Sequence, residues 1–436
     1  MNTTTAPRLS PGLAPASSMP AAARRVLALL EGLPCGQLQL QLPQGGVMHL
    51  PRTPPAGSAV PQDGEPAATL VLHDWRLFER LRRSGDIGLA ESYIDGEWDS
   101  PDLAALLRLC IRNRDHAQDL VYGHWWGRLG YRLRHLLQRN SRAGSARNIH
   151  AHYDLGNDFY RLWLDPGMSY SAAWFEGCTA AGASAPDAAA PGDLEQAQLA
   201  KMRHALRQAR VQPGQRLLEI GCGWGGLAET AAREFGARVT GVTLSREQLQ
   251  WGRRRLQDAG LAEQVELRYE DYRDLPARHA GQPFDAIVSI EMFEAVGREY
   301  WRGYFDTLRD CLKPGGYACI QTITLRDDLF ARYLRSTDFI QQFIFPGGLL
   351  PSPSAFEAEA RRAGFVVEHR LAFGRDYAET LRRWSQAFER EIAAVQRQGF
   401  DARFQRIWRF YLAYCEAAFD TGNTDVMQFT LRRPLP

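Results

Sequence analysis

The amino-acid sequence predicts an α/β protein in which a doubly wound parallel sheet follows a smaller N-terminal α+β domain. In the second half of the chain, short apolar runs rich in β-branched residues alternate with amphipathic helical patterns, as in consecutive βαβ units. The first part instead shows short strand patterns around a tight turn. With 436 residues, of which 45% are hydrophobic and 23% charged, the chain can form two or three domains and is neither wholly disordered nor collagen-like.

The N-terminal α+β domain is expected over residues 23–115, after a flexible tail at 1–22. Apolar and polar residues alternate on both sides of a Pro- and Gly-containing turn, which predicts a β-hairpin. A helical period of apolar residues then takes over. The predicted elements are strands at 38–42, 47–50 and 69–72, followed by a stretch of helical periodicity from 75 to about 109.

A basic segment, residues 116–147, links the two predicted domains. Residues 1–150 carry 17 basic and 13 acidic side chains, so their net charge is +4, whereas that of the remainder is −2. Four Leu residues of the segment fall on one helical stripe, with Arg, Trp and Tyr around them, a pattern that suits an anionic membrane surface. A solvated interdomain helix explains the pattern equally well. Nucleic-acid binding is not expected, because no recognised motif accompanies the charge.

The second domain is expected over residues 148–436. Its tract at 178–192 is of low complexity and predicts a loop. The predicted elements are strands at 217–220, 239–243, 265–267, 284–290 and 317–321, two amphipathic helices within 376–420 and a closing strand at 426–431. Ligands of such a sheet bind at the carboxyl ends of its strands.

Cysteine usage and hydropathy indicate a cytoplasmic protein. The seven cysteines are scattered, with neither a CxxC pair nor His at metal spacing, which indicates reduced thiols and predicts no metal site. No apolar run approaches the roughly 20 residues of a membrane-spanning helix. The apolar burst at 26–30 is too short for the core of a signal peptide.

The sharpest local signal is a strand that runs directly into glycines. Residues 217–220 are followed by Gly221, Gly223 and a further Gly pair that opens a helix, and Glu219 precedes the first Gly by two positions. Glycine permits a tight turn and close approach of the backbone to a ligand. A carboxylate at this place repels a pyrophosphate and suits a cationic ligand. The alternative is a tight turn without a ligand.

This turn resembles the glycine loop of class I S-adenosylmethionine-dependent methyltransferases, which have a Rossmann-like fold. Further motifs, in order over residues 70–436, resemble the cyclopropane fatty acid synthase family. They are residues 88–99, 152–165, 168–171, 241–245 with Gln248, 271–275, 292–294, 312–316 and 345–348. The resemblance implies a methyltransferase domain at 148–436 with S-adenosylmethionine as its cofactor.

The resemblance also implies which residues contact this cofactor. They are Tyr170, Ser171, Glu219, Gly221, Gly223, Thr243, Gln248, Glu270, Asp271 and Tyr272. For Tyr170 the alternative is core packing, and for Gln248 it is a solvated position in the first turn of a helix.

The implied reaction is attack of an acyl-chain double bond on the sulfonium methyl, which leaves a carbocation until a base removes a proton. In the family the base is a bound bicarbonate, held by Cys, Glu, His and Tyr side chains. Glu294 and Tyr377 match two of these positions, but Ala172 replaces the Cys and Gln321 replaces the His. The candidate catalytic residues are therefore Glu294, Tyr377 and Gln321, and Glu294 is expected to serve proton removal. Alternatively, Glu294 is a strand-end acid near a helix N-terminus.

The two replacements leave three interpretations open. Bicarbonate still binds and the product is a cyclopropane; the base is repositioned and the product is methyl-branched or carries a methylene group; or the protein is a non-catalytic lipid- or cofactor-binding member. Methyl transfer is favoured, because the glycine turn, Glu294 and Tyr377 are kept. The expected partner is an unsaturated phospholipid of the membrane, contacted peripherally from the cytoplasmic face, and the sequence allows a homodimer.

Overall fold

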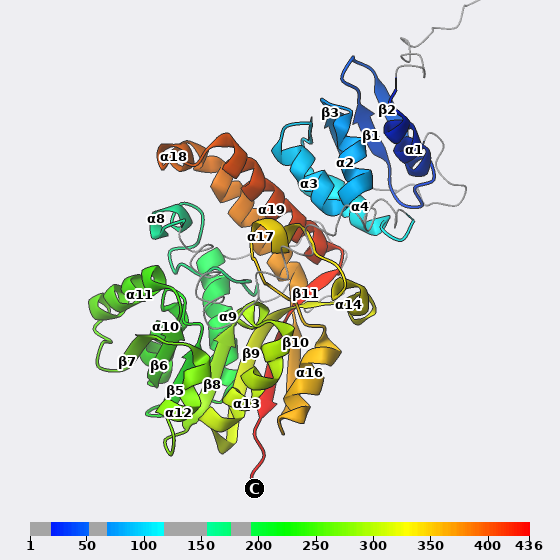
Figure 1. The fold of residues 1–436 in the computed structure, drawn as a ribbon. Coiled ribbons are helices and arrows are strands. Elements are labelled where there is room, and N and C mark those ends of the chain that lie inside the picture. Colours follow the sequence, from blue (N-terminus) through cyan, green and yellow to red (C-terminus); the bar gives the residue numbers. More distant parts are fainter. Residues whose placement is uncertain (1–18, 52–67, 117–154, 176–192) are drawn as a thin grey trace, which may run out of the picture. The chain divides into compact units, whose positions relative to one another are not determined.

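The computed structural model describes residues 19–51, 68–116, 155–175 and 193–436, and Figure 1 draws them as a ribbon. The chain forms two compact units, Met1–Gly130 and Tyr131–Pro436. Most of the expected tail, nearly all of the basic segment and the low-complexity tract lie outside the described residues. Their structures, and the expected domain limits, remain predictions.

The first unit contains a four-stranded sheet of order β2-β1-β3-β4. The expected hairpin is present, since β1 pairs antiparallel with β2, and β1 also pairs parallel with β3. Every second side chain of these strands points into the core, and Leu40, Leu50 and Leu72 are among them. The strands are β1 (Leu38–Gln41), β2 (Val47–Leu50), β3 (Ala68–Leu72) and β4 (Trp98–Asp99).

The long helical stretch predicted in this unit is interrupted. Gly85, with φ +60°, ends one helix and precedes the next, and buried Trp98 begins a short strand that pairs with β3. The helices of the unit are α1 (Ala21–Leu30), α2 (Arg76–Ser84), α3 (Asp86–Ile94) and α4 (Leu103–Arg112).

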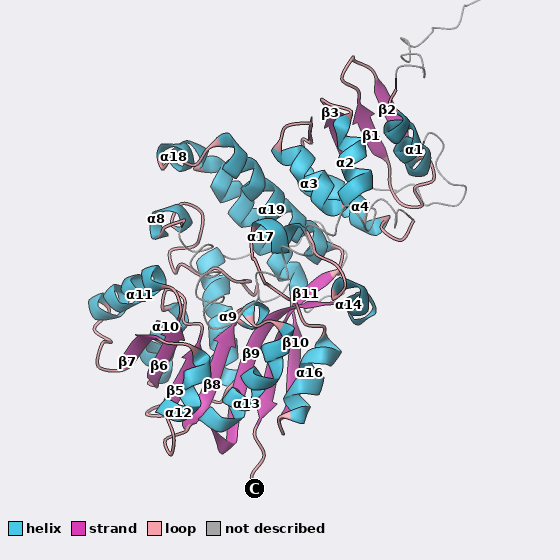
Figure 2. Cartoon of the chain, viewed as in Figure 1, coloured by secondary structure: helices cyan, strands magenta, loops and turns pink. Residues whose placement is uncertain are grey.

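The second unit contains a seven-stranded sheet of order β10-β11-β9-β8-β5-β6-β7, flanked by helices (Figure 2). The five strands β5 to β9 pair in parallel. Strand β11 pairs antiparallel with β9, and the edge strand β10 pairs antiparallel with β11. The predicted doubly wound sheet is confirmed. The strands are β5 (Arg216–Ile220), β6 (Arg238–Thr243), β7 (Val265–Tyr269), β8 (Phe284–Ile290), β9 (Leu312–Leu325), β10 (Val366–Ala372) and β11 (Thr424–Arg432).

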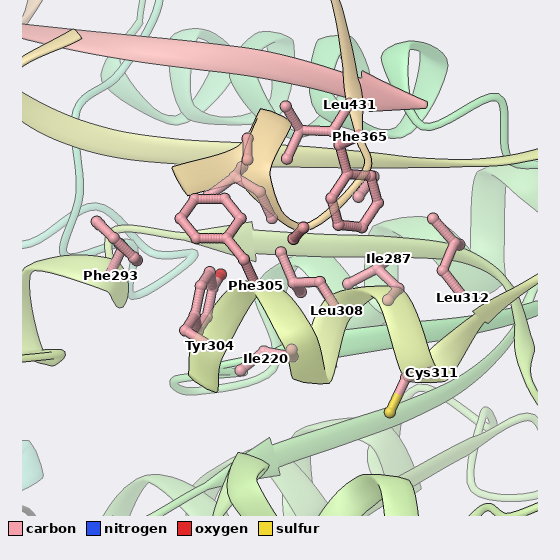
Figure 3. Close-up of a cluster of buried hydrophobic side chains, with 14 of the residues drawn as sticks. Ile220, Ile287, Phe293, Tyr304, Phe305, Leu308, Cys311, Leu312, Phe365 and Leu431 are labelled. Atoms are coloured by element: carbon pink, nitrogen blue, oxygen red, sulfur yellow. The ribbon is translucent and has the colours of Figure 1, made fainter. Parts of the chain in front are cut away.

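Two apolar cores cover the two faces of this sheet. On β5, Leu218 and Ile220 belong to one core and Leu217 to the other, because successive side chains of a strand point to opposite faces. The first core, shown in Figure 3, includes Phe305 and Leu308 of α13. The second packs helices α9 to α11 against the sheet. The helices that flank the parallel strands are α9 (Leu194–Gln208), α10 (Gly226–Phe235), α11 (Arg246–Asp258), α12 (Leu275–Arg278), α13 (Trp301–Cys311) and α16 (Pro353–Arg362).

The C-terminal region differs from the expectation in its details. It forms three helices where two were expected, and α17 packs against α19. Strand β10 was not predicted, since most of its residues are exposed at the edge of the sheet and no apolar alternation marks them. The remaining helices are α8 (Asn157–Tyr160), α14 (Asp327–Tyr333), α15 (Phe339–Phe343), α17 (Gly374–Arg390), α18 (Ile392–Arg397) and α19 (Ala402–Asp420).

The strand order positions the site. Strand β5 lies between β6 and β8. The chain adds β6 and β7 on one side of β5 and then β8 and β9 on the other side, so the strand order reverses at β5. Open α/β sheets bind ligands outside the carboxyl ends of the strands at such a switch point. Among the described residues, no helix combines the length and the apolar character that crossing a membrane requires.

Candidate active site

The glycine turn follows β5 directly at this switch point. Gly221 has φ +86° and Gly223 φ +50°, values that side chains disfavour. The backbone N–H groups of Gly221 and Cys222 both donate to the carbonyl of Val242, at 2.9 and 3.0 Å, which closes the turn against β6. A Cβ atom on Gly221 would lie 2.9 Å from the side chain of Met292. The turn therefore requires glycine for its conformation and for its close approach to the loop after β8.

Glu219, the last residue but one of β5, is buried beneath this turn. Its Oε2 atom has no hydrogen-bond partner among the described residues. Burial raises the pKa of this carboxyl well above its usual range, although the charge of Arg255 opposes the effect. A buried acceptor without a donor is costly, so a ligand that brings N–H or O–H groups to it satisfies the site. The ammonium and hydroxyl groups of S-adenosylmethionine fit this requirement.

The expected cofactor residues of β6 and β7 lie at the same edge of the sheet. Thr243 ends β6, and its hydroxyl donates to Oε1 of Gln248 at 3.3 Å. Gln248 is buried, which excludes the alternative of a solvated side chain. Glu270 is buried after β7 and forms ion pairs with Arg278 and Arg268.

The two residues after Glu270 are held in place by their neighbours. Asp271 accepts hydrogen bonds from the backbone and the guanidinium of Arg273, which fixes the turn. The ring of Tyr272 packs edge-on against Tyr304, 5.5 Å between centroids. Burial raises the pKa of Tyr272 to about 12, so its hydroxyl remains protonated.

Tyr170 and Ser171 come from the segment before the undescribed loop. The hydroxyl of Tyr170 lies 2.8 Å from that of Tyr411, and its ring packs 5.4 Å from Trp384. The hydroxyl of Ser171 accepts a hydrogen bond from the buried ammonium of Lys201. Tyr170 therefore does contribute to packing, while both side chains are anchored by residues from distant helices.

Glu294, the expected base, lies in a short 3-10 helix after β8 (Phe293–Ala295). Its Oε1 atom accepts a hydrogen bond from the backbone N–H of Ile323, whereas Oε2 is buried without a partner among the described residues. Burial, reinforced by the neighbouring charge of Glu291, raises the pKa of Glu294 to about 8. Glu294 is therefore protonated at neutral pH.

Sequence reasoning missed Glu291, which together with Glu294 forms the acidic cluster of the site. Its carboxylate accepts hydrogen bonds from the backbone N–H of Ala172 (2.8 Å), the amide of Gln321 (2.7 Å) and the hydroxyl of Tyr377 (2.8 Å). These three positions come from three separate parts of the chain. The only signal in the sequence was a second acid three residues before Glu294, directly after a strand.

The charges of Lys201 and Glu294 also influence Glu291. Burial lowers the pKa of Lys201 to about 8, against the opposing charges of Glu291 and Asp165. Burial raises the pKa of Glu291, but the charge of Lys201 and the three hydrogen bonds oppose this. The neighbouring charge of Glu291 instead raises the pKa of Glu294 further. Of the two carboxyls, Glu291 ionises first.

The sheet, the glycine turn and the buried acid below it define an S-adenosylmethionine-dependent methyltransferase. Residues 140–429 match the family model for mycolic acid cyclopropane synthetase. The chain belongs to this family, and it is a C-methyltransferase.

Curated relatives and a solved structure agree with this assignment. The chain is 38% identical over 372 residues to the tuberculostearic acid methyltransferase UfaA1 of Mycobacterium tuberculosis, covering 85% of this chain and 84% of that one. It is 34% identical over 387 residues to the cyclopropane-fatty-acyl-phospholipid synthase of Escherichia coli K12, covering 87% and 91%. The structure of mycolic acid cyclopropane synthase CmaA1 with SAH and CTAB superimposes with a TM-score of 0.58 at 31% identity, covering 66% of this chain and 98% of that one.

Proposed function

We propose that the protein transfers the methyl group of S-adenosylmethionine to the double bond of an unsaturated phospholipid acyl chain. The observation that carries this proposal is the contact between the glycine turn and the loop that bears the carboxyls, where Met292 lies directly against Gly221. A cofactor bound at the turn is then beside the carboxyls of Glu291 and Glu294, a pair suited to taking up a proton. Similarity to the cyclopropane-fatty-acyl-phospholipid synthase of Escherichia coli supports a phospholipid substrate.

The cofactor supplies an electrophilic methyl group, and the chain's residues manage the cation that forms on the acyl chain. Tyr377 is buried and donates its hydroxyl to Glu291, and its ring lies 6.1 Å from that of the buried Trp384, between centroids. Aromatic faces stabilise a cation, and a water-free surrounding prevents its capture as an alcohol. Loss of a proton then yields a cyclopropane or a methyl-branched alkene or methylene chain. A non-catalytic role is not favoured, because the cofactor turn and the acidic cluster are both present.

Peripheral attachment to the cytoplasmic face of a membrane is part of the proposal. Its support is the sequence pattern of the basic segment, which lies outside the described residues. Co-sedimentation with vesicles should increase with the fraction of anionic lipid and decrease when Arg128, Arg132 and Arg134 are replaced by Gln. Binding that depends on neither would refute the attachment. A homodimer remains a further expectation, which light scattering would test.

The experiment for the activity uses methyl-labelled S-adenosylmethionine with vesicles of monounsaturated phospholipid, and vesicles of fully saturated phospholipid as the control. Mass spectrometry of the released fatty acids should find the label on the unsaturated chains alone. Label on saturated chains, on headgroups or on neither lipid contradicts the proposed substrate. Nuclear magnetic resonance of the product separates a ring from a branch.

A further inference from the structure

We propose that the side-chain carboxylate of Glu291 is a built-in base that occupies the place of the bound bicarbonate implied by the family resemblance. This inference rests on the proposed methyl transfer to an alkene. Its consequence is an enzyme whose turnover does not depend on bicarbonate.

The hydrogen-bond donors around Glu291 carry the inference. Three of the four positions implied to hold bicarbonate, Ala172, Gln321 and Tyr377, direct a donor to the Glu291 carboxylate at 2.7–2.8 Å. A carboxylate and a bicarbonate present the same planar pair of oxygens. A bicarbonate placed here would find these donors engaged and would face a second anion, which is unfavourable in a buried site. The residues present do not fit a bound bicarbonate.

The replacement of the expected His by Gln321 agrees with this role. The carbonyl of Gln321 accepts a hydrogen bond from Nε2 of Gln428 at 2.9 Å, and the carbonyl of Gln428 lies 2.6 Å from Nδ1 of His204. This series of hydrogen bonds orients the amide of Gln321 so that its N–H group points at Glu291. A side chain that donates without titrating is suited to holding a carboxylate permanently.

Glu291 also keeps the capacity to take up a proton. Oε1 accepts two hydrogen bonds and Oε2 accepts one, so one lone pair of Oε2 is not used by these three donors. The residue is partly exposed, whereas the Ala172, Gln321 and Tyr377 that surround it are buried. The charged and titratable groups that influence it are Lys201, Glu294 and Tyr377.

The backbone at Glu291 is strained. Its φ of +48° makes it one of three described residues other than glycine in the left-handed region, with Met168 and Arg210. Residues other than glycine disfavour this conformation, because it brings Cβ too close to the following carbonyl oxygen. Such outliers cluster at functional sites. Here the strained residue is the one whose carboxylate contacts residues 172, 321 and 377.

In the proposed step the methyl group moves from sulfur to the alkene, and a proton moves from the acyl chain to Glu291. The π electrons of the alkene form a bond to the transferred methyl as the sulfur–methyl bond breaks, and the sulfur keeps that electron pair. The other alkene carbon becomes cationic. Oε2 of Glu291 takes a proton either from the new methyl, whose C–H electrons close the ring, or from an adjacent carbon, whose C–H electrons form a double bond. The products are a neutral acyl chain and a protonated Glu291.

Three variants test the proposal in buffer stripped of carbon dioxide. Glu291→Gln keeps the shape of the side chain and removes the base, so kcat should fall by about 10²–10⁴-fold while the Kd for S-adenosylmethionine is unchanged. Glu291→Gly suits the positive φ and frees the three donors, so it should bind ¹³C-bicarbonate, seen as line broadening in ¹³C nuclear magnetic resonance, and regain turnover with it. Glu357→Gln changes a buried glutamate of α16 outside the site, and its kcat should remain within about twofold of that of the original protein.

The original protein should neither bind ¹³C-bicarbonate nor turn over faster when it is added. Stimulation by bicarbonate, or a kcat of Glu291→Gln close to the original value, overturns the proposal. A folded Glu291→Gly variant that does not broaden the bicarbonate signal overturns the assigned anion site. If the original protein methylates no unsaturated lipid in either buffer, the proposed function fails instead, while the ¹³C measurement still tests the anion site.

Discussion

Replacing Glu294 by Gln should stabilise the protein at neutral and basic pH and leave it unchanged in acid. The folded protein holds the pKa of Glu294 at about 8 through burial and the nearby charge of Glu291, whereas the ordinary value is 4.5. A carboxyl with a raised pKa stabilises the fold fully below pH 4.5, and this contribution is lost as the pH rises to 8. At 1.36 kcal/mol for each pKa unit, the loss is roughly 5 kcal/mol of unfolding free energy.

Gln mimics the protonated carboxyl, because its carbonyl still accepts from the backbone N–H of Ile323 and its amide replaces the acid proton. The assay is urea unfolding of both proteins at pH 5, 6, 7 and 8. The difference in unfolding free energy should be within about 1 kcal/mol at pH 5 and rise to several kcal/mol in favour of the variant at pH 8. A difference that stays constant with pH, or that favours the original protein at pH 8, would refute the assigned burial and charge of Glu294.

Further predictions concern the turn, the charge and the orientation of the acidic cluster. Gly221→Ala should cost about 1–3 kcal/mol of stability, because the φ of this residue is +86° and the new Cβ would meet Met292. It should also weaken S-adenosylmethionine binding, measured by calorimetry. The control Gly303→Ala should do neither, because a Cβ there meets nothing within 4 Å. Lys201→Met removes the charge that holds the pKa of Glu291 down, so the acid limb of the pH–rate profile should move by about one unit to higher pH. Gln428→Leu should lower kcat by about tenfold without changing the Kd for S-adenosylmethionine, because the amide of Gln321 loses its orienting hydrogen bond.

The parallel part of the sheet could be predicted because its strands are buried and rich in β-branched residues. Each of β5 to β8 was expected within two residues of its observed limits, and the glycine turn marks the switch point. Strand β10 carries no such signal, because it is exposed at the edge of the sheet. The break at Gly85 depends on a φ of +60° that tertiary packing selects, which the helical period of the neighbouring residues does not reveal.

In the active site, too, some residues could be predicted from sequence motifs and others could not. Motif order placed Glu219, Thr243 and Gln248 at one edge of the sheet, where parallel strands bring consecutive carboxyl ends together. Glu291 could not be found in this way, because its role depends on donors from residues 172, 321 and 377 that meet only in the folded chain. The loss of the expected Cys and His was visible in the sequence, but the carboxylate that compensates for it was not.

The most direct test of the account is the mass spectrum of the acyl chains after incubation of the protein with methyl-deuterated S-adenosylmethionine and a monounsaturated phospholipid, in buffer free of carbon dioxide. The account predicts that the unsaturated chains acquire the labelled carbon without added bicarbonate, because the base is part of the protein. Unsaturated chains that remain unlabelled until bicarbonate is supplied would contradict it.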